Sequence, residues 1–324
     1  MNLKKGDICP NCGKEITNNQ QIICEHCGNK LKVKKVVEEI AVKDIEARTK
    51  KQIPFSAPQI PNFEADGKKI KSKKKVKLPE QISFDYGQIQ EVEVEILQEI
   101  EIELKIQFIK VDNNEFNTGI GVIVENDRVI GISLHNCEIV RIPESITNLT
   151  SLKKLNLSYN QIETLPESIR KLRSLEYLDL SNNLLKVLPK SIYKLVLLNE
   201  LKLSLNEIIT IPESIINLTL LTKLDLSYNK ITTIPKSICF LSSLEELNLR
   251  VNQIESIPKL IMNLISLTNL DLSYNVLFDL PESIKNLLKL KTLLILQNPL
   301  SKMMDKKTKV LIKLLQQKGV SITK

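Results

Sequence analysis

Between residues 129 and 300 the hydrophobic residues recur with a period of 23 positions, and the pattern is repeated eight times. Its clearest copy holds Leu152, Leu155, Leu157, Asn160 and Ile162 at fixed spacings. The asparagine slot recurs in every later copy, and one period before Asn160 it is filled by cysteine. These slots are Cys137, Asn183, Asn206, Asn229, Asn252, Asn275 and Asn298. A pattern that returns in phase predicts stacked copies of one structural unit.

The alternation within each copy predicts a short strand, with Leu155 and Leu157 pointing inward and Asn156 outward. The chain then turns, and an inward asparagine can satisfy the buried backbone groups that the turn exposes. Leu165-Pro166 predicts an extended residue followed by a short helical turn. Because one unit cannot bury its own apolar face, the units are expected to stack into a solenoid with a shared core.

The register L-x-x-L-x-L-x-x-N/C-x-L resembles the leucine-rich repeat family, and the L-P-x-S-I-x-x-L ending resembles its intracellular Ras-group subtype. The resemblance implies an α/β solenoid of eight coils with a parallel concave sheet over 129–300. It also implies a non-catalytic scaffold or adaptor that binds a protein partner on the concave face. Members of this subtype often bind small GTPases or phosphatases.

Two flanking segments are expected to cap the solenoid. Residues 88–110 alternate acidic and aliphatic residues, which favours a strand, but they also fit a helix; we favour the helix. A hairpin is predicted over 121–132 with its tip at Asn126 and Asp127. Residues 88–128 would thus form the N-terminal cap, and a basic amphipathic helix in 301–324 would cover the last coil.

Four cysteines near the N-terminus follow the pattern C-x2-C-x11-C-x2-C, which resembles the zinc ribbon family. They are Cys9, Cys12, Cys24 and Cys27. Four thiolates can close a tetrahedral shell, so residues 1–33 are predicted to hold a structural Zn²⁺, with a rubredoxin-like iron as the alternative. His26 is then expected not to be a ligand. Cys137 and Cys239 fall in solenoid slots and are interpreted as packing residues.

Residues 34–87 are interpreted as a largely disordered, lysine-rich linker. Residues 68–77 contain seven lysines, and residues 1–90 carry 18 Lys and Arg against 11 Asp and Glu. The net charge of +8 therefore belongs mostly to this part of the chain. The lysines are either a solvated linker or a tether to nucleic acid or an acidic membrane surface. Nucleic-acid association through the ribbon and these lysines is the alternative function.

Outward positions of the predicted strands form the candidate binding surface. Tyrosines just before the asparagine slot and charged residues in the middle of each strand are the candidate contact residues. They are Tyr159, Asp179, Lys202, Asp225, Tyr228, Asp271 and Tyr274. The alternative is a generic polar face with no partner.

Enzyme chemistry has little support in the sequence. The three aspartates are two strands apart, roughly 10 Å, and are expected to face open water, where nothing raises a carboxylate pKa. The chain contains 2 histidines, so a catalytic triad is not expected, and no phosphate-binding glycine motif is present. No apolar run is long enough for a membrane span and no signal peptide is evident, so a cytoplasmic location is expected.

Overall fold

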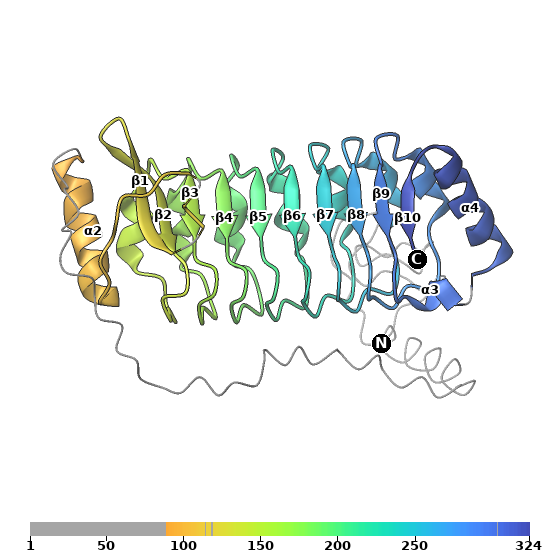
Figure 1. Ribbon diagram of the computed structural model, residues 1–324, viewed down its shortest axis with the longest axis horizontal. Helices are drawn as coiled ribbons and strands as arrows, with labels where there is room; N and C mark the ends of the chain where they lie inside the picture. The colour runs from red at the N-terminus through yellow and green to blue at the C-terminus, as the bar shows by residue number, and fades with distance from the viewer. Residues whose placement is uncertain (1–88, 114, 118, 303) are drawn as a thin grey trace, which may run out of the picture. The chain divides into compact units, whose positions relative to one another are not determined.

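A computed structural model describes residues 89–324 except residues 114, 118 and 303, with the side chains of 301 and 302 also left undescribed. The described residues form a sheet of ten strands that lie side by side in chain order. The helical turns of the coils lie on one face of this sheet (Figure 1). The predicted solenoid with a parallel sheet is therefore confirmed. The predicted ribbon of 1–33 and the linker of 34–87 lie outside the described residues.

The coils repeat one unit: a three-residue strand, a turn and a five-residue 3-10 helix. The inner strands are β3 (Lys154–Asn156), β4 (Tyr177–Asp179), β5 (Glu200–Lys202), β6 (Lys223–Asp225), β7 (Glu246–Asn248), β8 (Asn269–Asp271) and β9 (Thr292–Leu294). The 3-10 helices are η2 (Glu144–Asn148), η3 (Glu167–Lys171), η4 (Lys190–Lys194), η5 (Glu213–Asn217), η6 (Lys236–Phe240), η7 (Lys259–Asn263) and η8 (Glu282–Asn286). A proline stands immediately before each of these helices, as the Leu-Pro pattern predicts.

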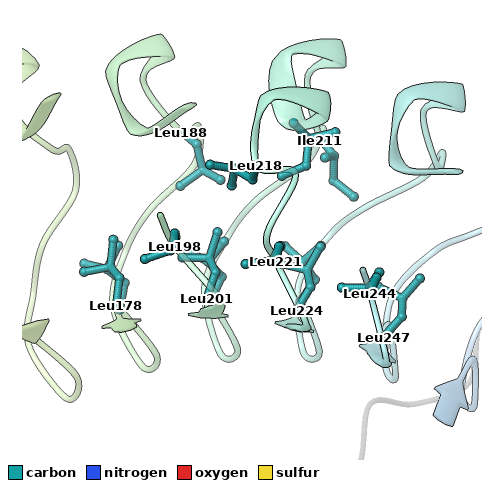
Figure 2. Packing of buried hydrophobic residues seen from close by; sticks show 14 of the residues in the cluster. Leu178, Leu188, Leu198, Leu201, Ile211, Leu218, Leu221, Leu224, Leu244 and Leu247 are labelled. Carbon is teal, nitrogen blue, oxygen red and sulfur yellow. The ribbon is translucent and has the colours of Figure 1, made fainter. Parts of the chain in front are cut away.

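The core lies between the strands and the 3-10 helices. Equivalent leucines of successive strands pair directly, as in Leu178 with Leu201 and Leu201 with Leu224. Figure 2 shows these side chains stacked beneath those that come from the 3-10 side, such as Leu188 and Leu218. Since each leucine is closed in by the coils on both sides, adjacent coils stabilise one another.

The asparagine slots form a ladder through the core. Asn183 donates from Nδ2 to the Leu157 carbonyl of the preceding coil at 3.0 Å, and its Oδ1 accepts the Ile162 N–H at 3.0 Å. The other asparagines repeat these bonds. Cys137 substitutes in part, because its thiol donates to the His135 carbonyl at 3.6 Å. The predicted role of the slot in satisfying buried backbone groups is confirmed.

Within 88–110, where both a strand and a helix fitted the sequence, the structure forms helix α2 (Glu91–Leu104). Its buried positions are Glu93, Ile96, Leu97 and Ile100, which share one helical face. The helix ends at Leu104 and is followed by Lys105, whose φ of 54° is left-handed. Glu93 reaches the neighbouring hairpin: its Oε1 accepts from Arg128 Nε and its Oε2 from the Val129 N–H, both at 2.7 Å.

The predicted hairpin is present as β1 (Ile120–Glu125) and β2 (Arg128–Leu134), which pair antiparallel. Asn126 and Asp127 at its tip both have positive φ, at 49° and 59°, as the tightest hairpin turns require. The outer edge of β1 is covered in turn, because Val111 donates to the Val122 carbonyl and Val122 donates to the Ile109 carbonyl, each at 2.9 Å. The first coil is thus closed against edge pairing.

At the other end the predicted cap helix is α4 (Lys306–Gln317), preceded by the short α3 (Pro299–Lys302). Asp305 caps α4 by accepting the Thr308 N–H at 2.6 Å. The sequence analysis missed β10 (Ser321–Thr323), which pairs in parallel with β9 and extends the sheet beyond the last coil.

Candidate functional site

Residues 112, 113, 115–117 and 119, named here the covering loop, cross the concave side of β2–β4. Asn113 Oδ1 accepts from Lys154 Nζ at 2.7 Å, and Asn117 Oδ1 lies 3.4 Å from Asn156 Nδ2. Phe116 is 2% exposed and meets the ring of Tyr177 edge-on, with 6.2 Å between ring centroids. The N-terminal third of the concave sheet is therefore already occupied by the chain itself.

This covering corrects one expectation. Asn156 and Asp179 do point to the concave side, but they are 1% and 9% exposed, so Asp179 does not face open water. The equivalent Lys202, Asp225 and Asp271 in later coils are more accessible. The accessible concave surface thus begins at about β5.

The aspartates at the outward position in the middle of the predicted strands also have a structural role that was not predicted from the sequence. Asp179, Asp225 and Asp271 each accept, through Oδ1, the N–H of the serine two residues later, at 2.9, 2.9 and 2.8 Å. One carboxylate oxygen of each therefore binds the turn that follows the strand, and at Asp225 and Asp271 the second oxygen faces the accessible part of the sheet.

Lys202 lies at the boundary between the covered and the accessible sheet. Its Nζ donates to the Tyr177 hydroxyl at 3.3 Å and pairs with Glu200 at 3.2 Å. The Tyr177 hydroxyl also lies 3.1 Å from Asp179 Oδ2. Burial, followed by the negative charge of Asp179, raises the pKa of Tyr177 above its usual range. Sequence reasoning missed Tyr177 because it considered two of the outward columns and omitted the one at the start of each strand.

The three candidate tyrosines share an unusual backbone. The backbone φ angles of Tyr159, Tyr228 and Tyr274 are 58°, 54° and 58°, which lie in the left-handed region. The other residues of this column, which stand just before the asparagine or cysteine slot, also have left-handed φ angles. This conformation favours glycine or asparagine and is uncommon for other residues. Tyr159 is 51% exposed and packs against His135, with 4.9 Å between ring centroids. Tyr228 and Tyr274 are half-buried.

Arg250 joins the last two tyrosines into one cluster. Its guanidinium carbon lies 4.5 Å from the centroid of the Tyr274 ring, a cation–π distance, and Tyr228 and Asp271 lie close enough to interact with its charge. The sequence analysis missed Arg250, although a signal exists. Its slot, two before the asparagine, holds serine in five other coils, so the arginine departs from the repeat.

Beside this cluster the strands β7–β9 frame a shallow hollow of about 160 Å³. The lining combines polar side chains with leucines. They include Glu246, Asn248, Asn269, Asp271, Thr292 and Leu294. The tyrosine–arginine cluster and the hollow together place aromatic, cationic and acidic groups on the accessible half of the sheet.

Metal-binding groups, thiols and membrane spans bear on the other functions that the described residues could have. Over 89–324, with the gaps stated above, no group of three or more His, Cys, Asp or Glu side chains is arranged to hold a metal ion. Cys239 is fully buried, and burial raises the pKa of the Cys137 and Cys239 thiols to about 11, so both stay protonated near neutral pH. Within the same residues no helix is long and apolar enough to cross a bilayer. Cys9, Cys12, Cys24 and Cys27 lie outside this part of the chain.

Comparison with known proteins agrees with the repeat geometry. The leucine-rich repeat family model matches residues 131–185, 181–231, 197–254 and 219–277, which lie within the repeat region described above. Leucine-rich repeat domains generally mediate protein–protein interactions and are typically non-enzymatic. No match was found among curated proteins.

Several solved structures are similar. An internalin (inlF) from Listeria monocytogenes is 27% identical, with a TM-score of 0.51 over 68% of this chain and 61% of the internalin. A leucine-rich repeat protein of Leptospira interrogans is 26% identical, with a TM-score of 0.44 over 70% and 74%. The plant peptide hormone receptor RGFR1 in complex with RGF2 is 29% identical, with a TM-score of 0.46 over 55% and 28%. The chain thus spans less than two thirds of the internalin and of the plant receptor.

Proposed function

We propose that this protein is a non-catalytic scaffold or adaptor that binds a protein partner on the accessible concave surface of β5–β9. The observation that carries the proposal is the cluster formed by Tyr228, Arg250 and Tyr274, which lies on the sheet beside the shallow hollow. Tyrosine and arginine are enriched among residues that dominate binding energy at protein interfaces.

The backbone of the tyrosine column supports this proposal. A left-handed slot would be filled at least cost by glycine or asparagine, as in Asn182. Tyrosine is costly there, and the rest of the coil does not require it, because the column holds leucine and valine elsewhere. Retaining large aromatic side chains in strained positions is more consistent with a contact role than with a folding role.

The charges on the concave surface support a partner that carries both positive and negative groups. Lys223 pairs with Glu246 at 3.1 Å, and Arg250 lies near Asp271, so the surface alternates in sign instead of presenting one charge. Such a pattern favours a specific protein over a uniform polyanion. The likeness to the Ras-group subtype makes small GTPases and phosphatases the first partner classes to test.

The test is affinity capture with the full chain. Replacing Tyr228 and Tyr274 together with alanine is expected to abolish recovery of a partner that wild type retains, because truncating central aromatic residues removes most of the binding energy. The matched control replaces three exposed apolar residues off the concave face: Val187→Ser, Ile209→Ser and Phe278→Ser. Equal recovery by all three proteins would refute the concave site.

For the N-terminal segment we propose a structural Zn²⁺ ribbon that serves as an accessory module. The spacing of Cys9, Cys12, Cys24 and Cys27 supports this proposal. The purified full chain is expected to contain one zinc ion per molecule by elemental analysis, and the variant with Cys24→Ser and Cys27→Ser is expected to lose it, because only two ligands remain. Cys137→Ser is the control and should retain the metal. Iron in place of zinc, or equal metal in both variants, would contradict the assignment.

A further inference from the structure

The 3-10 helices and the turns that follow them carry a second surface, on the side of the coil opposite the strands (Figure 1). Large apolar side chains are exposed there in consecutive coils. The set named here the apolar strip consists of Leu197, Ile216, Leu220, Phe240, Ile265 and Leu288. Ile265 is 62% and Leu288 87% exposed, so these side chains protrude instead of packing into the core.

The period of the repeat brings these residues together. Leu197 and Leu220 are 23 positions apart and occupy one slot in adjacent coils. Ile265 and Leu288 are also 23 positions apart and occupy the slot one residue earlier in two later coils. Ile216 and Phe240 are 24 positions apart. Two periods further on, the same two slots hold Met262 and Asn286, whose Sδ and Nδ2 atoms lie 4.0 Å apart.

The repeat itself does not require apolar residues in these slots. In the first coils the equivalent positions hold Asn148, Thr150, Arg170 and Arg173. The strip therefore begins at the coil that contains Leu197 and has a cause other than folding. Exposed apolar side chains over several coils indicate a site that binds another protein or a membrane.

The charged residues near the apolar strip indicate what kind of surface it binds. Exposed lysines, Lys194, Lys236, Lys259 and Lys289, lie in the same helices and turns as the strip. Glutamates are fewer in these helices and turns than lysines, and one of them, Glu282, pairs with Lys285 at 2.6 Å. The strip thus combines aliphatic side chains with an excess of positive charge, so a second copy would be repelled and an anionic surface attracted.

We propose that the apolar strip and its lysines dock this protein on an anionic lipid surface. Protruding Leu, Ile and Phe with flanking lysines match the composition of segments that lie in a membrane interface. The exposed positions in the helices and turns of 190–289 include no Tyr, Trp or Arg, the residues that typically anchor protein interfaces. Docking by this side would leave the concave sheet turned away from the lipid and open to a protein partner.

Vesicle co-sedimentation of the full chain tests the proposal. Wild type is expected to sediment with vesicles of phosphatidylcholine and phosphatidylserine but not with phosphatidylcholine alone, and high salt should weaken the binding. The variant Leu220→Ser, Ile265→Ser, Leu288→Ser should bind the mixed vesicles about tenfold more weakly or worse, because the inserted apolar area is lost. The control is again Val187→Ser, Ile209→Ser, Phe278→Ser, which should bind as wild type.

All three proteins carry the same lysines at 68–77, so any attraction through those residues is equal and the comparison isolates the strip. Thermal melting of each protein checks that the exposed substitutions leave the fold intact. Equal vesicle binding by both variants, or no binding by wild type, would overturn the proposal. So would a concentration-dependent dimer, seen by light scattering, that the strip variant alone abolishes, because the strip would then be a self-association surface.

Discussion

Replacing Asn229 with alanine is expected to lower the free energy of unfolding by about 1 to 3 kcal/mol. Asn229 Nδ2 donates to the carbonyls of Leu203 and Leu226 at 2.9 and 3.1 Å, and its Oδ1 accepts the Ile208 N–H at 2.9 Å. Alanine cannot replace any of these bonds and leaves buried backbone groups without partners. Because the bonds join two coils, the loss also weakens the cooperativity between them.

Urea and thermal denaturation measure this change directly. For a domain of this size each kcal/mol corresponds to roughly 2 to 4 °C in the melting temperature. Asn217→Ala is the matched control, since Asn217 is an exposed asparagine in η5 and its replacement should change stability by less than about 0.5 kcal/mol. A melting curve for Asn229→Ala that overlays that of wild type would contradict the ladder.

The second large effect is expected at Glu93, which ties the N-terminal helix to the first hairpin. Glu93→Ala should cost about 2 to 3 kcal/mol, because the buried Val129 N–H loses a charge-assisted acceptor. Arg128 contributes less, since its side chain is 34% exposed and water can replace the carboxylate. Amide hydrogen exchange should report faster exchange at Val129 and along β1 and β2.

Glu95→Ala is the control for this experiment. Glu95 lies on the same helix, two residues away, and is exposed. Its replacement alters helix propensity and charge to the same extent but removes no buried contact. If the two alanine variants lost the same stability, the contribution of Glu93 would be helix propensity and not anchoring of the hairpin.

The repeat region could be predicted closely because its period fixes the register. Once Leu155 and Leu157 point inward, every equivalent residue must follow, and the paired leucines of β3–β9 bear this out. The secondary structure of residues 88–110 could not be predicted in the same way, since these residues fit both the two-residue period of a strand and the period of a helix. The contact of Glu93 with Arg128 and Val129, more than 30 positions away, distinguishes helix from strand, and no local pattern encodes it.

The candidate site was predicted less completely. The outward columns follow from strand geometry, but the covering loop does not, because its polar sequence resembles any surface loop. Its position depends on Phe116 meeting Tyr177, two residues 61 positions apart. The left-handed backbone at Tyr159 and the hydrogen bonds of Asp225 and Asp271 depend on turn geometry, which spacing alone does not give.

The covering loop has a consequence for how such a protein can diversify. The repeats determine stability, since they hold the core, whereas the covering loop determines how many strands of the concave sheet remain accessible. A shorter or longer loop would widen or narrow the proposed binding surface without altering a single leucine. Breadth of recognition and robustness of folding are therefore controlled by separate stretches of sequence and can change independently of each other.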